Sequence, residues 1–139
     1  MATTIKGIEN AELIERIFGG WPSFHDAEIH RILLTRDCNP RPQMEVTIHH
    51  WQMTSEVDSN GYYVLKNQTL STLRFSEVTD LVLTDFNQQN VLWELEISEL
   101  ADSSSDSRFS VSMSTSFGCE ASFKCKEIRV LTATPYTKP

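Results

Sequence analysis

The segment "GGWPSFHDAEIH", residues 19–30, holds the densest group of side chains in the chain that could do chemistry. If its second half is extended, alternation directs two carboxylates and an imidazole to one side of the backbone. Such side chains can bind a divalent cation, and a histidine from the next strand could add a fourth ligand. The candidate ligands are Asp26, Glu28, His30, and His49 or His50. No spacing matches H-E-x-x-H or paired C-x-x-C, so we predict no metal and no cofactor and keep a small metal-dependent hydrolase as the alternative function.

A hydrolytic pair of His25 and Asp26 is the second chemical possibility, because the two side chains could meet in an irregular corner. The string "SFHD" also fits a structural cap, in which the Ser23 hydroxyl accepts the backbone N–H of Asp26 and the carboxylate reaches back. A backbone carbonyl would then hold His25. No nucleophile elbow, phosphate-binding glycine loop or nucleotide fingerprint occurs, so we predict no catalytic residue. The predicted structural corner consists of Trp21, Pro22, Ser23, Phe24, His25, Asp26 and Glu28, with Trp21 and Phe24 packed inward.

A short helix over residues 10–18 should precede this corner. Asn10 is a suitable N-cap, and Glu12 and Glu15 suit the positive end of the helix dipole. An apolar stripe runs along one face, and Gly19 can supply a left-handed C-cap. The stripe consists of Leu13, Ile14, Ile17 and Phe18.

After the corner, the hydrophobic period changes from that of a helix to two residues, which is typical of strands. In "QMEVTIHHW" Met44, Val46 and Ile48 share a face, and in "VLWELEIS" the inward set would be Val91, Trp93, Leu95 and Ile97. The other predicted strands are "EIHRILLTR", "TLSTLRF", "TDLVLTDF", "RFSVSMST" and "CEASFKC". Turn signals such as Asn60-Gly61 separate them. We therefore predict a mainly β (α+β) fold: an antiparallel sheet, sandwich or half-barrel of seven to eight short strands with one N-terminal helix.

The composition indicates one soluble domain over residues 1–139. The net charge of −7 argues against nucleic acid as a partner, because a phosphate backbone requires a basic surface. No apolar stretch is long enough for a membrane span and no secretory signal is visible, so a cytoplasmic location and no membrane partner are expected. Cys119 and Cys125 fall on one face of a strand and should be buried small hydrophobes.

Acidic residues gather between positions 94 and 106, with no Lys or Arg among them. Such a surface would attract a cationic protein and accelerate its association, although a solvated loop has the same composition. The candidate contact residues are Glu94, Glu96, Glu99, Asp102 and Asp106.

The corner also carries a family resemblance. "FGGWPSFHDAEI" followed by "IHHW", then the segment from Gly61 to Leu92, resembles the immunity protein 50 family of bacterial polymorphic toxin systems, from about Ile17 to Ile97. The resemblance implies a small protein that binds a cognate toxin domain and blocks it, without enzymatic activity or a cofactor. Together with the charge, this predicts an immunity protein that neutralises a cationic toxin by direct non-catalytic binding.

Overall fold

The computed structural model describes residues 7–101 and 107–137 of the chain. Strands dominate these ranges, which confirms the predicted fold class. The elements are β1 (Ile8–Glu9), α1 (Glu12–Phe18), β2 (Glu28–Thr35), β3 (Gln43–Val57), β4 (Tyr63–Ser76), β5 (Thr79–Thr84), β6 (Val91–Glu99), β7 (Phe109–Phe117), β8 (Glu120–Cys125) and β9 (Glu127–Pro135). No helix in the described ranges is long and apolar enough to cross a bilayer.

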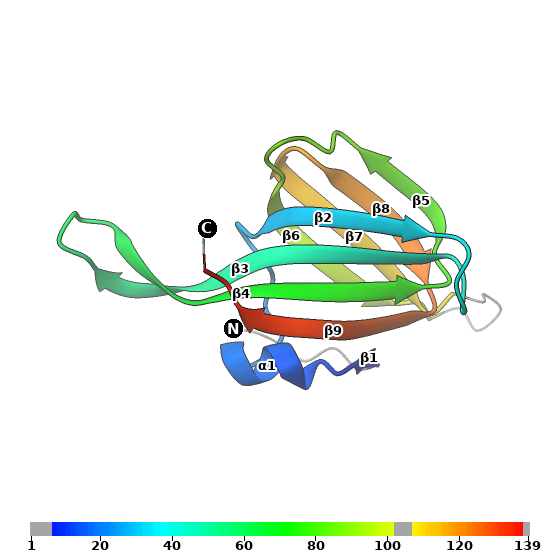
Figure 1. Ribbon diagram of the computed structural model, residues 1–139, viewed down its shortest axis with the longest axis horizontal. Coiled ribbons are helices and arrows are strands. Elements are labelled where there is room, and N and C mark those ends of the chain that lie inside the picture. Colours follow the sequence, from blue (N-terminus) through cyan, green and yellow to red (C-terminus); the bar gives the residue numbers. More distant parts are fainter. Residues whose placement is uncertain (1–6, 102–106, 138–139) are drawn as a thin grey trace.

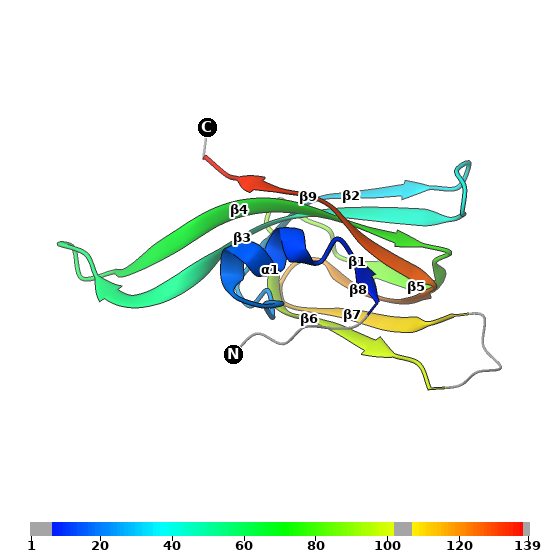
Figure 2. The same ribbon diagram turned by 90° about the horizontal axis from the view of Figure 1, so that it is seen from below.

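The strands form one nine-stranded sheet in the order β1-β9-β4-β3-β2-β6-β7-β8-β5. The sheet folds over between β2 and β6, so that β2, β3, β4 and β9 form one layer and β5 to β8 form a second (Figures 1 and 2). All neighbours pair antiparallel except β1 and β9, which are parallel. The structure is therefore a sandwich made from one bent sheet.

The core lies between the two layers, where inward side chains of both meet. Met44, Val46 and Ile48 are fully buried, as their alternation predicts. Phe75 of β4 and Phe123 of β8 make a direct contact between the layers, with ring centroids 4.9 Å apart in an edge-to-face arrangement. Cys119 and Cys125 are buried and unpaired, as predicted.

Helix α1 lies beside β9 at one open side of the sandwich (Figure 2) and packs on β9 and β4. Its C-terminus agrees with the prediction: Gly19 has a φ of 80° and its N–H bonds to the carbonyl of Glu15. Its N-terminus corrects the prediction, because Ala11 is the N-cap. Asn10 has a φ of 58° and donates its side-chain amide to the carbonyl of Val130 at 3.5 Å, so it does not cap the helix.

Strand β6 departs from simple alternation. Leu92 and Leu95 are buried, whereas two residues predicted to point inward do not do so: Trp93 is 58% exposed, and Val91 lines a groove on the outer face. The register against β7 shifts on both sides of Leu92, and each irregularity of this kind changes which residues face the core. Beyond the shift, Leu95 and Ile97 occupy the inward face as predicted.

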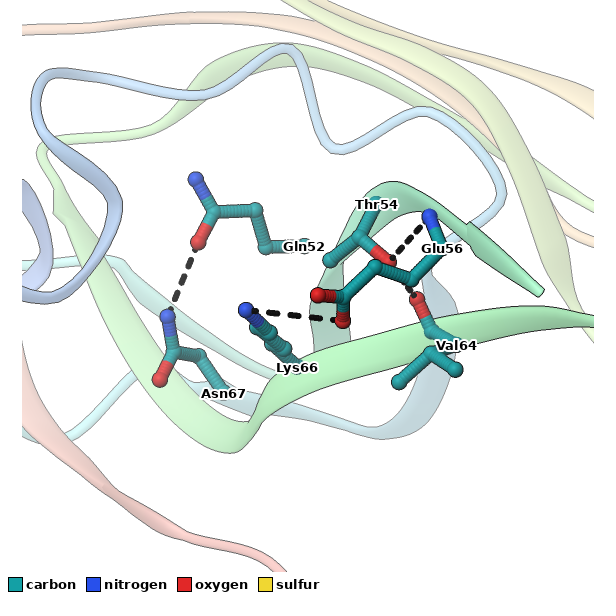
Figure 3. A network of polar contacts seen from close by, with 6 residues as sticks. All are labelled: Gln52, Thr54, Glu56, Val64, Lys66 and Asn67. Carbon is teal, nitrogen blue, oxygen red and sulfur yellow. Dashed lines mark hydrogen bonds and ion pairs between the residues drawn. The ribbon is translucent and has the colours of Figure 1, made fainter. Parts of the chain in front are cut away.

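The hairpin of β3 and β4 extends beyond the sandwich as an arm, residues 52–66 (Figure 1). Neither β2 nor β9 pairs with this part, so both edges of the ribbon are open. The register of the two strands shifts between His50 and Gln52 of β3. On the opposite strand, β4, Asn67 lies within this shift and has a φ of 55°. A bulge of this kind bends the arm relative to the sheet. The Asn67 amide donates to the Gln52 side chain at 2.9 Å, and Thr54 and the Glu56–Lys66 ion pair link the strands further out (Figure 3).

Candidate functional site

The corner formed by residues 19–27 connects the two layers of the sandwich. Its backbone continues the ladder between β2 and β6: Asp26 donates its N–H to the carbonyl of Leu92 at 2.9 Å, and Leu92 returns a bond to Ala27 at 2.8 Å. The N–H of Leu95 bonds to the carbonyl of Ser23 at 3.1 Å. The corner therefore has a structural task, because these bonds hold the sheet together where it folds over.

The apolar residues of the corner are packed inward, as the sequence predicts. Trp21 and Phe24 are 4% and 3% exposed, with their rings in edge-to-face contact at 5.6 Å. Phe24 also contacts the imidazole of His50, which is stacked on Phe18 from the helix at 4.7 Å. This cluster anchors the corner and the end of the helix to β3.

The polar residues of the corner differ in part from the prediction. The Ser23 hydroxyl accepts the N–H of His25 at 3.3 Å instead of that of Asp26, whose N–H is occupied by Leu92. His25 is held by a backbone carbonyl, as expected, through Nδ1 and Trp93 at 2.8 Å. The side chains of His25 and Asp26 meet at 3.5 Å, and both are about half exposed.

The outward side chains after the corner line a groove of about 460 Å³ on the outer face of the first layer. Asp26 and Glu28 supply carboxylates from the corner and the start of β2. A bulge in β2 at His30 places this residue on the outer face next to Arg31. The full lining is Asp26, Glu28, His30, His49, Trp51, Gln89, Val91 and Tyr136.

The aromatic part of this groove is a continuous series of rings from three segments of the chain. His30 lies 5.7 Å from His49 and 5.5 Å from Tyr136, between ring centroids. His49 lies 4.1 Å from Tyr136 and 4.9 Å from Trp51. The N–H of Tyr136 bonds to the carbonyl of Gln68 at 2.9 Å, which fixes the segment after β9 beside β4.

The lining of the groove contains carboxylate side chains. No Lys or Arg belongs to its lining among the residues that the structure describes, whereas Asp26 and Glu28 both do. Glu28 contacts Nε2 of His30 at 3.3 Å, and His49 shares a 2.6 Å hydrogen bond with the side chain of Gln68. These contacts orient the rings, and the groove has a surface of carboxylates and aromatic rings.

The residues proposed for a metal site are brought together only in part. Asp26, Glu28, His30 and His49 line the one groove, but His50 points to the opposite face and is 2% exposed. Its Nε2 bonds to the hydroxyl of Ser71 at 2.7 Å, and burial together with His49 lowers the pKa of His50 to about 3. In residues 7–101 and 107–137, no three His, Cys, Asp or Glu side chains are grouped so that they could hold a metal ion.

Three of the acidic residues predicted to contact a toxin, Glu94, Glu96 and Glu99, lie on β6 in the second layer. Glu94 and Glu96 pair across the ladder with Ser114 and Ser112, and Glu96 is exposed on the outer face. The Glu99 carboxylate lies 3.9 Å from the guanidinium group of Arg108. The charge of Glu99 is therefore partly compensated by a residue just beyond the acidic segment of the sequence. Asp102 and Asp106 lie outside the described residues.

The arm, which extends away from the sandwich (Figure 1), presents exposed apolar side chains. A hollow of about 720 Å³ separates the base of the arm from the end of α1 and from Pro22 and Ser23. Large exposed apolar groups are common at protein interfaces. The exposed set is Met53, Val57, Tyr62, Tyr63 and Leu65.

Four residues of the groove lining were not predicted as site residues: Trp51, Gln89, Val91 and Tyr136. Trp51 follows the two histidines, so its alternation with His49 was a usable signal. Tyr136 reaches the groove only because β9 runs beside β4, and Gln89 and Val91 only because the sheet folds over at the corner. Local patterns contain no information on those contacts.

Comparison with known families places the chain among immunity proteins. It belongs to the immunity protein 50 family, whose model matches residues 10–136. The match extends the resemblance seen in the sequence to the β7, β8 and β9 strands. No curated protein and no solved structure matches the chain.

Proposed function

We propose that this protein neutralises a cognate toxin in the cytoplasm by binding it directly, and that it does so without catalysis. The observation that carries the proposal is the family match over residues 10–136, which includes nearly all of the described sandwich. An immunity protein has to recognise its partner with high specificity, and a large shaped surface supplies this specificity.

The charge of the molecule supports a cationic toxin as the partner. The chain carries a net charge of −7, and both the groove and the outer face of β6 present carboxylates. Complementary charge steers encounter and disfavours wrong partners. The contact surface predicted from the sequence, Glu94, Glu96 and Glu99 with Asp102 and Asp106, remains part of this proposal.

Co-expression with the toxic domain encoded beside this gene tests the proposal. Cells that produce the toxic domain should survive only when this chain is produced as well, and the two proteins should elute together on size exclusion. A variant with Phe75→Asp, which places a charge in the core, is the control that loses the fold and should lose protection. Death of cells that contain soluble wild-type chain would contradict the proposal.

A further inference from the structure

We propose that the groove between Asp26, Glu28 and Tyr136 receives an arginine side chain from the partner protein. The inference rests on the proposed function for the identity of that partner as the toxin. Under this proposal, Asp26 at the end of the corner and Glu28 at the start of β2 bind the partner, while the backbone of the corner joins the two layers.

The charges of the groove select a cation. Asp26 and Glu28 both line it, and the described part of the chain contributes no Lys or Arg to the lining. Their side chains are 46% and 35% exposed, so both carboxylates can be reached from solvent. A bound cation would form charge-assisted hydrogen bonds with them, and these are stronger than bonds between neutral groups.

The rings select among cations. Trp51, His49 and Tyr136 form a connected aromatic surface beside the carboxylates. A guanidinium group stacks on aromatic faces and bonds carboxylates with two parallel N–H groups, whereas an ammonium group is a compact and strongly hydrated charge. Because the groove offers both surfaces, it fits arginine better than lysine. A divalent ion fits less well, because the described residues contain no ligand cluster for one.

The size of the groove is adequate. Its volume of about 460 Å³ falls within the range of about 300–1,000 Å³ typical of ligand sites, so one arginine side chain enters with room for the flanking backbone. The hydrogen bonds of the corner to β6 hold Asp26 and the start of β2 in place. The groove is therefore formed before the partner binds.

A titration of the wild-type protein with N-acetyl-arginine amide tests the ligand chemistry directly. The readout is the indole N–H signal of Trp51 in a proton–nitrogen NMR spectrum, assigned by the loss of that signal in Trp51→Phe. N-acetyl-citrulline amide, which has the same shape without the charge, is the matched control at equal ionic strength. We expect a saturable shift with the arginine compound alone. Equal shifts with both compounds, or no saturation, would overturn the inference.

The charge-neutral variants test the carboxylates. Glu28→Gln should weaken binding of the arginine compound about tenfold, the loss expected for one charge-assisted hydrogen bond. Asp26→Asn suits the second position, because Asp26 has a φ of 66° and asparagine tolerates this conformation. Glu127→Gln, which changes an exposed carboxylate at the start of β9, should leave the affinity unchanged.

The same variants separate this inference from the proposed function when the toxic domain is the ligand. We expect the wild type and Glu127→Gln to bind it equally, and the double variant Asp26→Asn, Glu28→Gln to bind it at least about tenfold more weakly. Equal binding by all three would reject the groove as the docking site, even if free arginine binds, and would leave the proposed function intact. No binding by the wild type would reject the proposed function, and the arginine titration would then decide whether the groove binds a guanidinium group.

Discussion

At the scale of single residues, His50 shows how strongly the corner depends on a neutral, buried ring. It is enclosed by Phe18 and Phe24, and its pKa is lowered to about 3, first by burial and then by His49. In the unfolded chain the ordinary pKa of about 6.5 is restored. As pH falls below 6.5 the unfolded state therefore takes up a proton that the folded state does not bind, so stability should decline between pH 6.5 and about pH 3.

The pH dependence of unfolding tests this linkage. Between pH 6 and pH 5, the wild type should lose about 1 kcal/mol of its free energy of unfolding through this group, since a fully developed difference of one proton is worth about 1.4 kcal/mol per pH unit. His50→Phe removes the titrating group and should flatten the curve by that amount. Urea titrations of both proteins at each pH provide the measurement. The same slope in both would show that His50 is not the source.

The polar side chain of Asn90 is buried, whereas that of Ser23 is exposed. The side-chain oxygen of Asn90 accepts the N–H groups of Asn87 and Cys119 at 2.8 and 3.0 Å, and its amide donates to the carbonyl of Asn87 at 2.8 Å. Gly118 lies so close that a Cβ there would be 2.7 Å from the Asn90 side chain. This junction therefore ties the loop before β6 to the turn between β7 and β8.

Alanine substitutions at the two positions should differ clearly. Asn90→Ala leaves the N–H groups of Asn87 and Cys119 without this acceptor, the second of them in a buried position, and should lower the free energy of unfolding by about 3 kcal/mol. Ser23→Ala removes one 3.3 Å bond at an exposed site and should cost less than about 0.5 kcal/mol. Chemical denaturation measures both values. Similar losses at the two sites would contradict the assigned roles.

At the scale of elements, the sequence was most informative where local pattern and tertiary environment agree. The inner part of β3, with Met44, Val46 and Ile48, and the C-terminal cap at Gly19 follow from spacing alone. Trp93 was placed on the wrong face because the shifts around Leu92 depend on pairing with β7 and with the corner. Such pairings join residues far apart in sequence, and no periodic pattern encodes them.

The hydrophobic pattern of the sequence also did not predict the arm. Its residues are exposed on both faces, so no alternation between buried and exposed positions marks them as strand. The turn at its tip joins β3 to β4, and there the Asp58 carboxylate accepts the N–H groups of Asn60 and Tyr62 at 2.9 and 3.0 Å. The sequence shows the Asn60-Gly61 turn signal but not the length of the strands on either side.

The exposure of the arm predicts that it adds little to stability. Replacing residues 54–64 by Asn-Gly would join Met53 to Leu65, which face each other across the ladder. The free energy of unfolding should change by less than about 1 kcal/mol, because a two-stranded ribbon with exposed faces buries little apolar surface. Urea denaturation of the shortened and full-length proteins makes the comparison. A loss of more than about 2 kcal/mol would show that the arm supports the sandwich.

At the scale of the whole molecule, the acidic surfaces lie on different layers and can be tested separately. Changing Glu94, Glu96 and Glu99 to Gln should slow association with the toxic domain at low salt, because long-range attraction is reduced.

Close charge pairs at interfaces are worth about 1.5–7 kcal/mol, so these variants should also bind more weakly if the three carboxylates contact the toxic domain directly. Asp102→Asn with Asp106→Asn forms a second group, and Glu127→Gln on β9 is the control. Stopped-flow association at two salt concentrations is the measurement, and unchanged rates and affinity at low salt would remove this patch from the interface.

We propose that this molecule inhibits the toxin by binding it and changes no bond. A titration of the toxic domain's activity with purified chain tests it most directly. We expect inhibition to grow in proportion to the chain added, to become complete only when the chain is no longer far below the toxin in molar amount, and to be reversed when the toxin is recovered from the complex with its mass unchanged. Complete inactivation by a small fraction of an equivalent, or a toxin of altered mass, would show turnover and contradict the proposal of non-catalytic binding.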